Sequence, residues 1–298
     1  MILTVQNSTK FYIGTAGWSY KDWEGIVYQK GGTHLSELAQ WFNTVEVNVT
    51  FYRMISPDLT QKWCEQTRKY SEFKFLIKVN QLLTHDLNPS PSTINEFKAL
   101  LEPLRINHKL GGLLFQFPWR FKNNAENREY LANLFSHFDG YPKAVEFRHA
   151  SWNNQEILTL LTDLQIAFTN IDQPVIGKSL SRTLYYTAQL AYFRYHGRNR
   201  ANWFSEKAGR DQRYDYLYDE TELADFKDEI QKIQQQIHSV YVIFNNHFKG
   251  QAVVNALQLA NMLTGQMFTL PSSLCQRYPV LKSISDSSGQ NQTQLDLF

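Results

Sequence analysis

Eight short apolar segments recur along the chain, and their alternation with amphipathic segments is the strongest constraint on its fold. Each is rich in β-branched or aromatic residues and is bounded by Gly, Pro, Asn or Asp, a pattern typical of β-strands. The predicted strands are Phe11–Ala16, Val45–Val49, Phe73–Val79, Gly112–Phe117, Lys143–Phe147, Ile166–Ile171, Ala191–Tyr195 and Ser239–Phe244.

Most of the segments between these strands have the apolar spacing of a helix. Ser56-Pro57, for example, is typical of a helix cap followed by a proline in the first turn. The segment Asp172–Ala188 is the exception, because its helical pattern is poor. The predicted helices are His34–Phe42, Pro57–Thr67, Ser92–Leu104, Glu126–Phe138, Asn153–Leu164, Glu220–Ile237 and Gln251–Leu263.

The alternation of strands and helices predicts an α/β protein with a parallel sheet and helices packed outside it. Eight such units predict a closed (β/α)8 TIM barrel, and a doubly wound open sheet is the alternative. The first strand is followed by Gly14-Thr15-Ala16-Gly17-Trp18, which lacks the third glycine of a dinucleotide-binding turn. We therefore predict the barrel.

The chain divides into one predicted domain and a tail. Residues 1–281 contain the barrel and the segment Pro271–Leu281, whose apolar residues are able to pack back on it. Residues 282–298 begin with a Ser-, Gln- and Asn-rich stretch that has little to bury. We expect these residues to form a flexible C-terminal tail.

Composition narrows the cellular setting. Hydrophobic residues make up 43% of the chain, which excludes global disorder, and a formal net charge of +2 does not argue for or against a nucleic-acid partner. Cys64 and Cys275 form neither a metal-ligand spacing nor a disulfide framework. No secretory signal and no membrane-spanning apolar run is visible. We expect a cytoplasmic protein with no membrane partner and no evident cofactor.

Polar residues occupy one parity of several predicted strands. Glu46 and Asn48, for example, alternate with Val45 and Val47. Because residues two apart share a face, we expect the polar parity to point into the barrel near its C-terminal mouth, where barrel enzymes place catalytic groups. The predicted general acids or bases are Glu46, Glu146, Asp172 and His196. The predicted substrate or phosphate contacts are Lys78, Arg148, Arg194, Arg198, Asn48, Gln116, Asn245 and Tyr20.

Two other interpretations of this polar mouth stay open. Buried charges must be paired whether or not they catalyse a reaction, so the cluster can also be an ion-pair network that fills the barrel. Neighbouring Arg and Lys side chains would repel a cation, so a divalent metal is unsupported and the metal content stays unknown. The side chains of metal-ligand type are Glu46, Glu146, Asp172, His85, His149 and His196, which lack clustered spacing.

The segment after the predicted seventh strand concentrates positive charge. Between Arg194 and Arg213 lie six Arg and Lys residues and only two carboxylates, interleaved with aromatic residues such as Trp203. Arginine together with aromatic rings suits phosphates and unstacked bases, so we expect a nucleic acid or another phosphorylated ligand. A solvated surface loop is the alternative.

Aromatic residues also follow the first predicted strand. Trp18, Tyr20 and Trp23 lie within six residues of one another in the segment that leads away from the barrel mouth. We expect them either to form an aromatic wall beside the mouth or to cover the edge of the barrel.

Seven motifs occur in order at the strand ends. They are IGTAGWSYKDWEG at 13–25, FNTVEVNVTFYR at 42–53, FQFP at 115–118, VEFRHASW at 145–152, YFRYHGRN at 192–199, RYDYLY at 213–218 and VYVIFNNH at 240–247. Together they resemble the YecE-like domain-of-unknown-function family over roughly Lys10 to Leu281. The resemblance implies a (β/α)8 barrel with a broad likeness to apurinic endonuclease barrels. The chain lacks an obvious rich set of His ligands such as the metal site of those enzymes.

The last five residues resemble the peptide with which bacterial polymerases and repair proteins bind the DNA sliding clamp. Apolar residues on a polar tail are suited to enter a groove on a partner, while a glutamine hydrogen-bonds at its rim. A frayed terminus that folds back on the barrel is the alternative. The predicted partner-binding residues are Gln294, Leu295, Asp296, Leu297 and Phe298.

These observations favour an enzyme that acts on DNA and is recruited by the sliding clamp. Phosphodiester hydrolysis, or strand cleavage at damage, is the predicted reaction. The first alternative is a clamp-associated adaptor that binds nucleic acid without catalysis. The second is a metabolic barrel that acts on a phosphorylated sugar.

Overall fold

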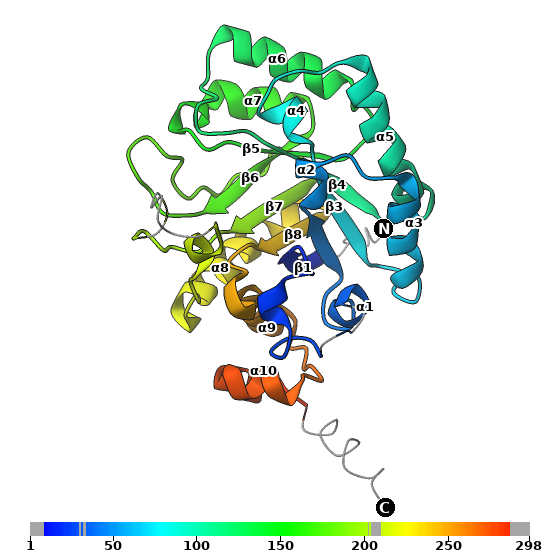
Figure 1. Cartoon of the computed structure of the whole chain (residues 1–298). Helices are drawn as coiled ribbons and strands as arrows, with labels where there is room; N and C mark the ends of the chain where they lie inside the picture. Colours follow the sequence, from blue (N-terminus) through cyan, green and yellow to red (C-terminus); the bar gives the residue numbers. More distant parts are fainter. Residues whose placement is uncertain (1–8, 30, 32–33, 202, 204–209, 287–298) are drawn as a thin grey trace, which may run out of the picture.

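Eight parallel strands close into a single barrel in the computed structural model, which describes residues 9–29, 31, 34–201, 203 and 210–286 (Figure 1). Each strand pairs with the next along the chain, and β8 pairs with β1 in a ladder that places Lys10 opposite Ser239. This pairing confirms the (β/α)8 TIM barrel and excludes an open sheet. The strands are β1 (Lys10–Ala16), β2 (Thr44–Val47), β3 (Lys74–Lys78), β4 (Leu110–Gln116), β5 (Lys143–Glu146), β6 (Ile166–Asp172), β7 (Leu190–Tyr195) and β8 (Ser239–Phe244).

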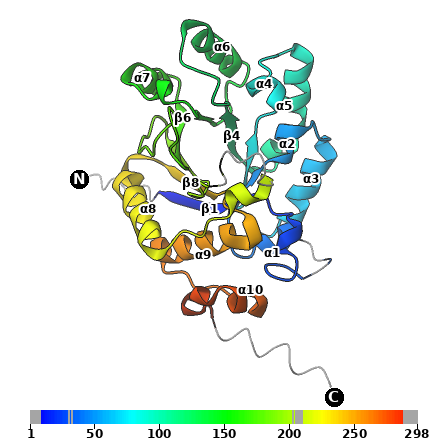
Figure 2. The ribbon, with the colours of Figure 1, turned by 60° about the vertical axis from the view of Figure 1, so that its left-hand side comes forward.

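The helices surround the barrel, as a turned view shows (Figure 2). α5 begins where the Ser90 side chain accepts a hydrogen bond from the backbone of Thr93, and α8 begins with a capping box between Asp219 and Glu222. Among the described residues, no helix has both the length and the apolar character needed to cross a membrane. The helices are α1 (His34–Leu38), α2 (Val49–Tyr52), α3 (Pro57–Gln66), α4 (Gln81–Thr84), α5 (Pro91–Ile106), α6 (Ala125–Ser136), α7 (Gln155–Asp163), α8 (Glu220–Ile233), α9 (Gln251–Thr264) and α10 (Ser272–Arg277).

Two predicted boundaries differ from the structure near the start of the chain. α1 ends at Leu38 rather than at Phe42, because the backbone N–H of Trp41 bonds back only three residues, to Leu38, and the chain tightens into a turn. β2 ends at Val47 rather than at Val49. Asn48 has helical backbone angles, and Val49 starts α2. The short helix therefore turns the chain directly at the barrel mouth.

The barrel holds two separate apolar cores. One fills the interior with side chains such as Leu76, Leu114 and Ile243. Tyr12 and Tyr241 stack there with ring centroids 4.6 Å apart, toward the N-terminal ends of their strands. The other core lies between the strands and the helices. Because apolar side chains fill the N-terminal part of the interior, polar interior residues gather at the C-terminal mouth.

The connection from β6 to β7 contains no helix in residues 173–189, all of which are described. This absence agrees with the poor helical pattern of that segment. Asn170 of β6 supports the connection instead. Its Oδ1 accepts from the backbone N–H of Tyr185 at 2.8 Å, and its Nδ2 donates to the carbonyl of the same residue at 2.8 Å. The side chain thereby satisfies backbone groups that a helix would have satisfied.

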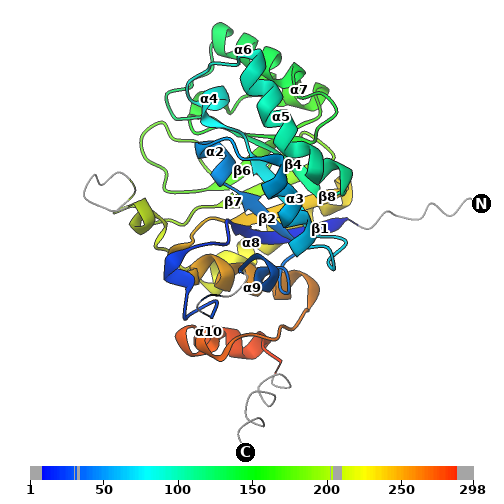
Figure 3. The ribbon, with the colours of Figure 1, turned by 45° about the vertical axis from the view of Figure 1, so that its right-hand side comes forward.

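The segment after α9 packs back on the barrel. α10 lies outside the ring of helices, next to α9 (Figures 1 and 3), and Leu274 and Leu281 are buried. Ile284 is also buried, and the N–H of Asp286 bonds to the carbonyl of Phe268 at 2.9 Å. The packed part of the chain thus reaches Asp286, beyond the boundary at residue 281 that we predicted. The clamp-like residues 294–298 lie outside the described residues.

Candidate functional site

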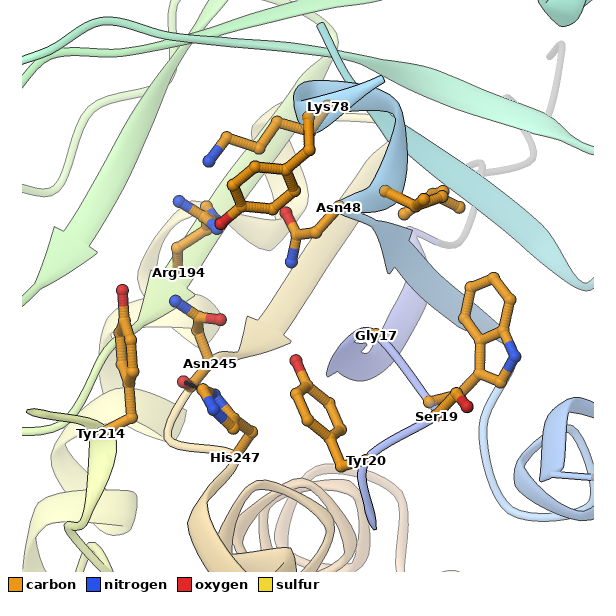
Figure 4. A pocket seen from close by; sticks show the side chains of 13 residues that line it. Gly17, Ser19, Tyr20, Asn48, Lys78, Arg194, Tyr214, Asn245 and His247 are labelled. Carbon is orange, nitrogen blue, oxygen red and sulfur yellow. Dashed lines mark hydrogen bonds between the residues drawn. The ribbon is translucent and has the colours of Figure 1, made fainter. Parts of the chain in front are cut away.

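A pocket of about 360 Å³ opens at the C-terminal mouth of the barrel (Figure 4). Its walls come from the loop after β1, the start of α2 and the ends of β3, β7 and β8. Aromatic side chains form part of the wall, with Tyr20 and Tyr214 on either side of His247. The other polar side chains that line the pocket are Ser19, Asn48, Lys78, Arg194 and Asn245.

Lys78 is the last residue of β3, and its ammonium group is unpaired. Its Nζ makes no hydrogen bond or ion pair with any residue that the structure describes, and its recorded contact is with the ring of Phe51, 4.1 Å from the centroid. Burial lowers the pKa of Lys78 to about 7, and the positive charge of Arg194 lowers it further against the opposing effect of Glu46 and Glu146. Near neutral pH this amine therefore exists in both protonation states.

Arg194 of β7, in contrast, is fully paired at its two terminal nitrogens although its edge lines the pocket. Nη1 donates to Oε2 of Glu146, and Nη2 donates to Oε1 of Glu46 at 2.8 Å. The hydroxyl of Tyr192 donates to the other oxygen of Glu46 at 2.8 Å. The side chains of Arg194 and both glutamates are at most 2% exposed. The two carboxylates hold the guanidinium rigidly behind the pocket.

Glu146 is shared between two arginines. Arg148 approaches its Oε1 at 2.5 Å, while Arg194 takes the other oxygen. Burial alone would raise the pKa of Glu146, but the two guanidinium groups outweigh burial and hold that pKa well below its usual range. Glu146 is therefore ionised at neutral pH, and both of its oxygens face cations.

His196 lies behind this network and is fully buried. Its Nε2 is 3.2 Å from Nη2 of Arg148, and its Nδ1 is 2.9 Å from the carboxamide of Asn245. Burial and the positive charges of Arg148 and Arg194 lower its pKa to about 3, so the imidazole is neutral. In this arrangement His196 connects the arginine network to Asn245, which lines the pocket.

Asp172 belongs to a second cluster beside the mouth. Arg198 donates to both of its carboxylate oxygens, at 2.9 and 2.8 Å, and also to Glu222 at 2.6 Å. The hydroxyl of Tyr218 donates to Asp172 at 2.8 Å and accepts from the backbone N–H of Gly197 at 2.8 Å. Hydrogen bonds to Asp172 raise the pKa of Arg198. This cluster ties the segment after β7 to the end of β6.

The loop after β1 supplies the aromatic side of the pocket. Tyr20 stacks on His247 with centroids 4.4 Å apart and planes at 13°, and Tyr214 lies against the same imidazole at 4.9 Å. Gly17 has φ of +88°, and a Cβ there would lie 3.0 Å from the Tyr20 hydroxyl, so glycine lets the loop turn this closely. Trp23 is buried beneath, with Nε1 donating to the carbonyl of His247 at 2.7 Å.

The residues that we predicted for the site fall into three groups. Five of them line the pocket: Asn48, Lys78, Arg194, Asn245 and Tyr20. Four form the buried network behind it: Glu46, Glu146, Arg148 and His196. Three are outside both groups: Asp172 and Arg198, which pair with each other, and Gln116, which donates to the carbonyl of Phe117.

Nine of the predicted residues thus line the pocket or lie directly behind it, while their chemical roles stay predictions. His247 and Tyr214 were not predicted as site residues. The signal for His247 was its position at the end of the eighth strand motif, and the signal for Tyr214 was the tyrosine-rich segment after the basic loop. Residues 202 and 204–209 of that loop lie outside the described part of the chain.

No metal centre is visible among the residues that the structure describes. These residues contain no group of three or more His, Cys, Asp or Glu side chains that could hold a metal ion. The six side chains of metal-ligand type that the sequence suggested are instead engaged elsewhere or separated, as with His149, which bonds to Ser151 at 2.8 Å.

The fold and the site define a (β/α)8-barrel protein with a pocket of cations, carboxamides and aromatic rings at its C-terminal mouth. Residues 12–276 match the family described as "Protein of unknown function DUF72". The chain belongs to this family.

Relatives match most or part of the barrel. The UPF0759 protein YunF of Bacillus subtilis is 32% identical over 269 residues, which cover 85% of this chain and 94% of YunF. The UPF0759 protein YecE of Escherichia coli K12 is 32% identical over 144 residues, 46% of this chain and 48% of YecE. A crystal structure of a DUF72 family protein from Thermotoga maritima matches 85% of this chain and 99% of its own, with 35% identity and a TM-score of 0.75. None of these names states an activity.

Proposed function

We propose that the protein is an enzyme that acts on nucleic acid and binds a phosphate group in the barrel mouth. The observation that carries this proposal is the unpaired Lys78 ammonium in the pocket. Glu46 and Glu146 are matched in charge by Arg194 and Arg148, so the protonated Lys78 leaves the mouth with an excess of positive charge. An anionic ligand is the group that such a mouth favours.

The aromatic side of the pocket favours a nucleotide over a bare anion. Tyr20, Tyr214 and Trp18 line the pocket together with Lys78, and every nucleobase has a face that stacks on such rings. The volume of about 360 Å³ is at the lower end for small-ligand sites and suits one nucleotide unit rather than a duplex. We therefore propose that the reacting nucleotide is single-stranded or turned out of its duplex.

Cleavage of a phosphodiester, by hydrolysis or at a damaged nucleotide, is the reaction that we propose. The contacts support positioning roles for Glu46 and Glu146, which hold Arg194, and for His196, which contacts Arg148 and Asn245. The acid–base roles predicted for these three residues and for Asp172 stay untested.

A binding experiment tests the phosphate site. A fluorescent single-stranded oligonucleotide is titrated with wild-type protein and with Lys78→Met, at about 50 and about 200 mM salt. We expect the variant to bind about tenfold more weakly and to show a smaller salt dependence, because one phosphate contact is lost. The matched control is Lys122→Met, an exposed lysine after β4 at the same end of the barrel. Equal binding by wild type and Lys78→Met would refute the site, and salt-sensitive binding without any product would favour the adaptor alternative.

We also propose that Gln294–Phe298 recruit the protein to the DNA sliding clamp. The support is the sequence: the apolar residues Leu295, Leu297 and Phe298 follow a polar stretch that gives them nothing to pack against. A titration of the purified clamp with the full chain and with a chain lacking these five residues tests the proposal. We expect binding only with the full chain. Equal affinity of both chains would show that these residues are not the clamp contact.

A further inference from the structure

We infer that the amine of Lys78 is a nucleophile that forms an imine with the aldehyde carbon of a phosphorylated sugar in the barrel mouth. The inference rests on the proposed function only in that a phosphate group enters this pocket. The chemistry of the amine follows from the pocket itself, whichever molecule carries the aldehyde.

The amine of Lys78 differs from the other cations of the mouth in having no carboxylate partner. Three described arginines at or beside the barrel mouth have guanidinium groups that carboxylates hold: Arg148, Arg194 and Arg198. Lys78 has no such partner, because its amine makes no hydrogen bond or ion pair to a described residue. Its backbone, in contrast, is fixed, because its carbonyl accepts from Thr50 Oγ1 at 2.7 Å. An amine on a fixed strand end that no carboxylate pairs is available to react.

The protonation state of the amine determines whether Lys78 can react. Only an uncharged amine has the lone pair needed to attack a carbonyl carbon, so a nucleophilic lysine needs a pKa near the working pH. Burial lowers the pKa of Lys78 to about 7, against 10.5 for an ordinary lysine. The charged and titratable groups that face it are Arg194, Arg148 and His85, and the opposing Glu46 and Glu146.

Polar groups line the pocket together with the amine of Lys78. Asn48 lines the pocket, and its buried Oδ1 has no hydrogen-bond partner among the described residues. Asn245 enters from the end of β8 and Arg194 from the end of β7, and Figure 4 shows both facing the same space as Lys78. These groups are suited to bind the hydroxyl of an addition intermediate and the phosphate of the sugar.

The reaction balances without a cofactor or an oxidant. The lone pair of Nζ attacks the aldehyde carbon, and the C=O π electrons move to the oxygen, which takes up a proton. The two protons of the neutral amine and the former carbonyl oxygen leave as one molecule of water. A C=N bond to Lys78 replaces the C=O bond, and no atom is oxidised or reduced.

An aldehyde and a phosphate ester on the same short carbon chain occur in two kinds of molecule that fit this chemistry. A free aldose phosphate carries both in its open-chain form. A nucleic-acid strand carries both where a deoxyribose has lost its base, because the sugar ring then opens. The two sources share the reactive group and differ in size and in the flanking phosphates.

Reductive trapping tests the inference. The full chain is incubated with sodium cyanoborohydride and either glyceraldehyde 3-phosphate or a single-stranded oligonucleotide with one abasic site. Peptide mapping by mass spectrometry then locates the adduct. We expect the adduct on Lys78, and we expect the initial rate to rise about tenfold between about pH 6 and about pH 8, as the amine loses its proton.

Two variants sharpen the test. Lys78→Arg keeps a cation but cannot form the imine, so we expect no adduct at residue 78. Lys122→Arg, at an exposed lysine of the same barrel end, should trap as wild type does. If Lys78→Arg fails to fold, the peptide map of the wild type and its pH profile still show whether the adduct forms on Lys78.

The outcomes separate this inference from the proposed function. Binding of the oligonucleotide without an adduct would overturn the inference and leave the phosphate site intact. An adduct with glyceraldehyde 3-phosphate, together with no oligonucleotide binding, would support the nucleophile and overturn the nucleic-acid substrate. Adducts spread over surface lysines, with none preferred at Lys78, would overturn the inference for both sources.

Discussion

Lys78 and Arg194 line the same pocket, but their surroundings shift the pKa values of the two side chains in opposite directions. Two buried carboxylates bind Arg194, and although burial alone would lower the pKa of its guanidinium, the charges of Glu146 and Glu46 outweigh burial and raise that pKa. No carboxylate bonds to Lys78, so burial favours its neutral form. The difference assigns a fixed electrostatic role to the arginine and a reactive role to the lysine.

The pH dependence of stability tests the state of Lys78. Its folded pKa of about 7 lies below the usual 10.5, so the unfolded chain binds more protons between these values and wild-type stability rises with pH across that window. Below pH 7 the cost of the buried charge is fully present. We expect Lys78→Met to raise the free energy of unfolding by about 1 to 2 kcal/mol at pH 7, after allowance for solvent screening. The gain should shrink toward pH 10.

Urea unfolding of wild type and variant at several pH values measures this difference. Lys122→Met is the control, and its difference from wild type should stay flat with pH because its side chain is exposed. A Lys78→Met variant that is less stable than wild type at every pH would contradict the assigned state of Lys78.

Glu146 provides a second prediction at this scale. Glu146→Gln removes the charge that both Arg148 and Arg194 need, so we expect a loss of about 3 to 5 kcal/mol in the free energy of unfolding. The control is Glu156→Gln, which breaks an ion pair with Arg128 at a carboxylate that is 71% exposed. That loss should stay below about 1 kcal/mol. Equal losses in chemical unfolding would show that the buried network contributes no more than a surface pair.

The polar residues of the mouth were predictable from strand parity, and their roles were not. Glu46 and Glu146 each lie between two buried apolar residues of a predicted strand, which predicted their inward direction. Which cation stays unpaired depends on side-chain lengths and distances across the barrel, and strand parity contains no such information. The same limit hid His247, because its role depends on the stacking of Tyr20 on its ring.

At the scale of elements, α9 fixes the segment that leads from the mouth to α8. Asn255 of α9 is buried; its Oδ1 accepts from the N–H of Tyr218 at 3.0 Å, and its Nδ2 donates to the carbonyl of the same residue at 2.9 Å. Tyr218 in turn donates to Asp172. A side chain on the outer helix thereby positions a group beside the barrel mouth.

Asn255→Ala tests this connection. It leaves the N–H and carbonyl of Tyr218 buried without these partners, so we expect a loss of about 2 to 4 kcal/mol in stability. The measurement is thermal and urea unfolding, with Asn133→Ala on α6, an exposed asparagine inside a helix, as the control. Indistinguishable unfolding of the two variants would contradict the role of Asn255.

Most elements were predictable because their patterns are local. Helices such as α8 carry their own capping box and apolar stripe. For the connection from β6 to β7, the sequence showed only that the helical pattern is poor. The conformation of this connection depends on hydrogen bonds from Asn170 of β6, which no local pattern reveals. The end of α1 was missed, since apolar spacing continues to Phe42 while the backbone has already left the helix.

At the scale of the whole molecule, the barrel closes between the first and last strands, and the segment after α9 adds to its stability. The barrel was predictable by counting strand–helix units, because closure needs eight of them. The end of the packed segment was not predictable from the sequence, because Ile284 is a single buried residue within a polar stretch.

Truncation tests this part of the account. A chain that ends at residue 281 loses the buried Ile284 and the hydrogen bond from Asp286 to Phe268, which a chain ending at residue 286 keeps. We expect the shorter chain to be less stable by about 2 to 3 kcal/mol, as measured by urea unfolding. Equal stability would place the boundary of the domain at residue 281 after all.

The central claim is that the barrel mouth binds a nucleotide through Lys78 and the aromatic wall. The most direct test is a crystal structure of the protein soaked with thymidine 3′,5′-bisphosphate. The account predicts a phosphate within hydrogen-bond distance of Nζ of Lys78 and the base against Tyr20 or Tyr214. An empty mouth with the nucleotide bound elsewhere, or a nucleotide in the mouth whose phosphates avoid Lys78, would contradict it.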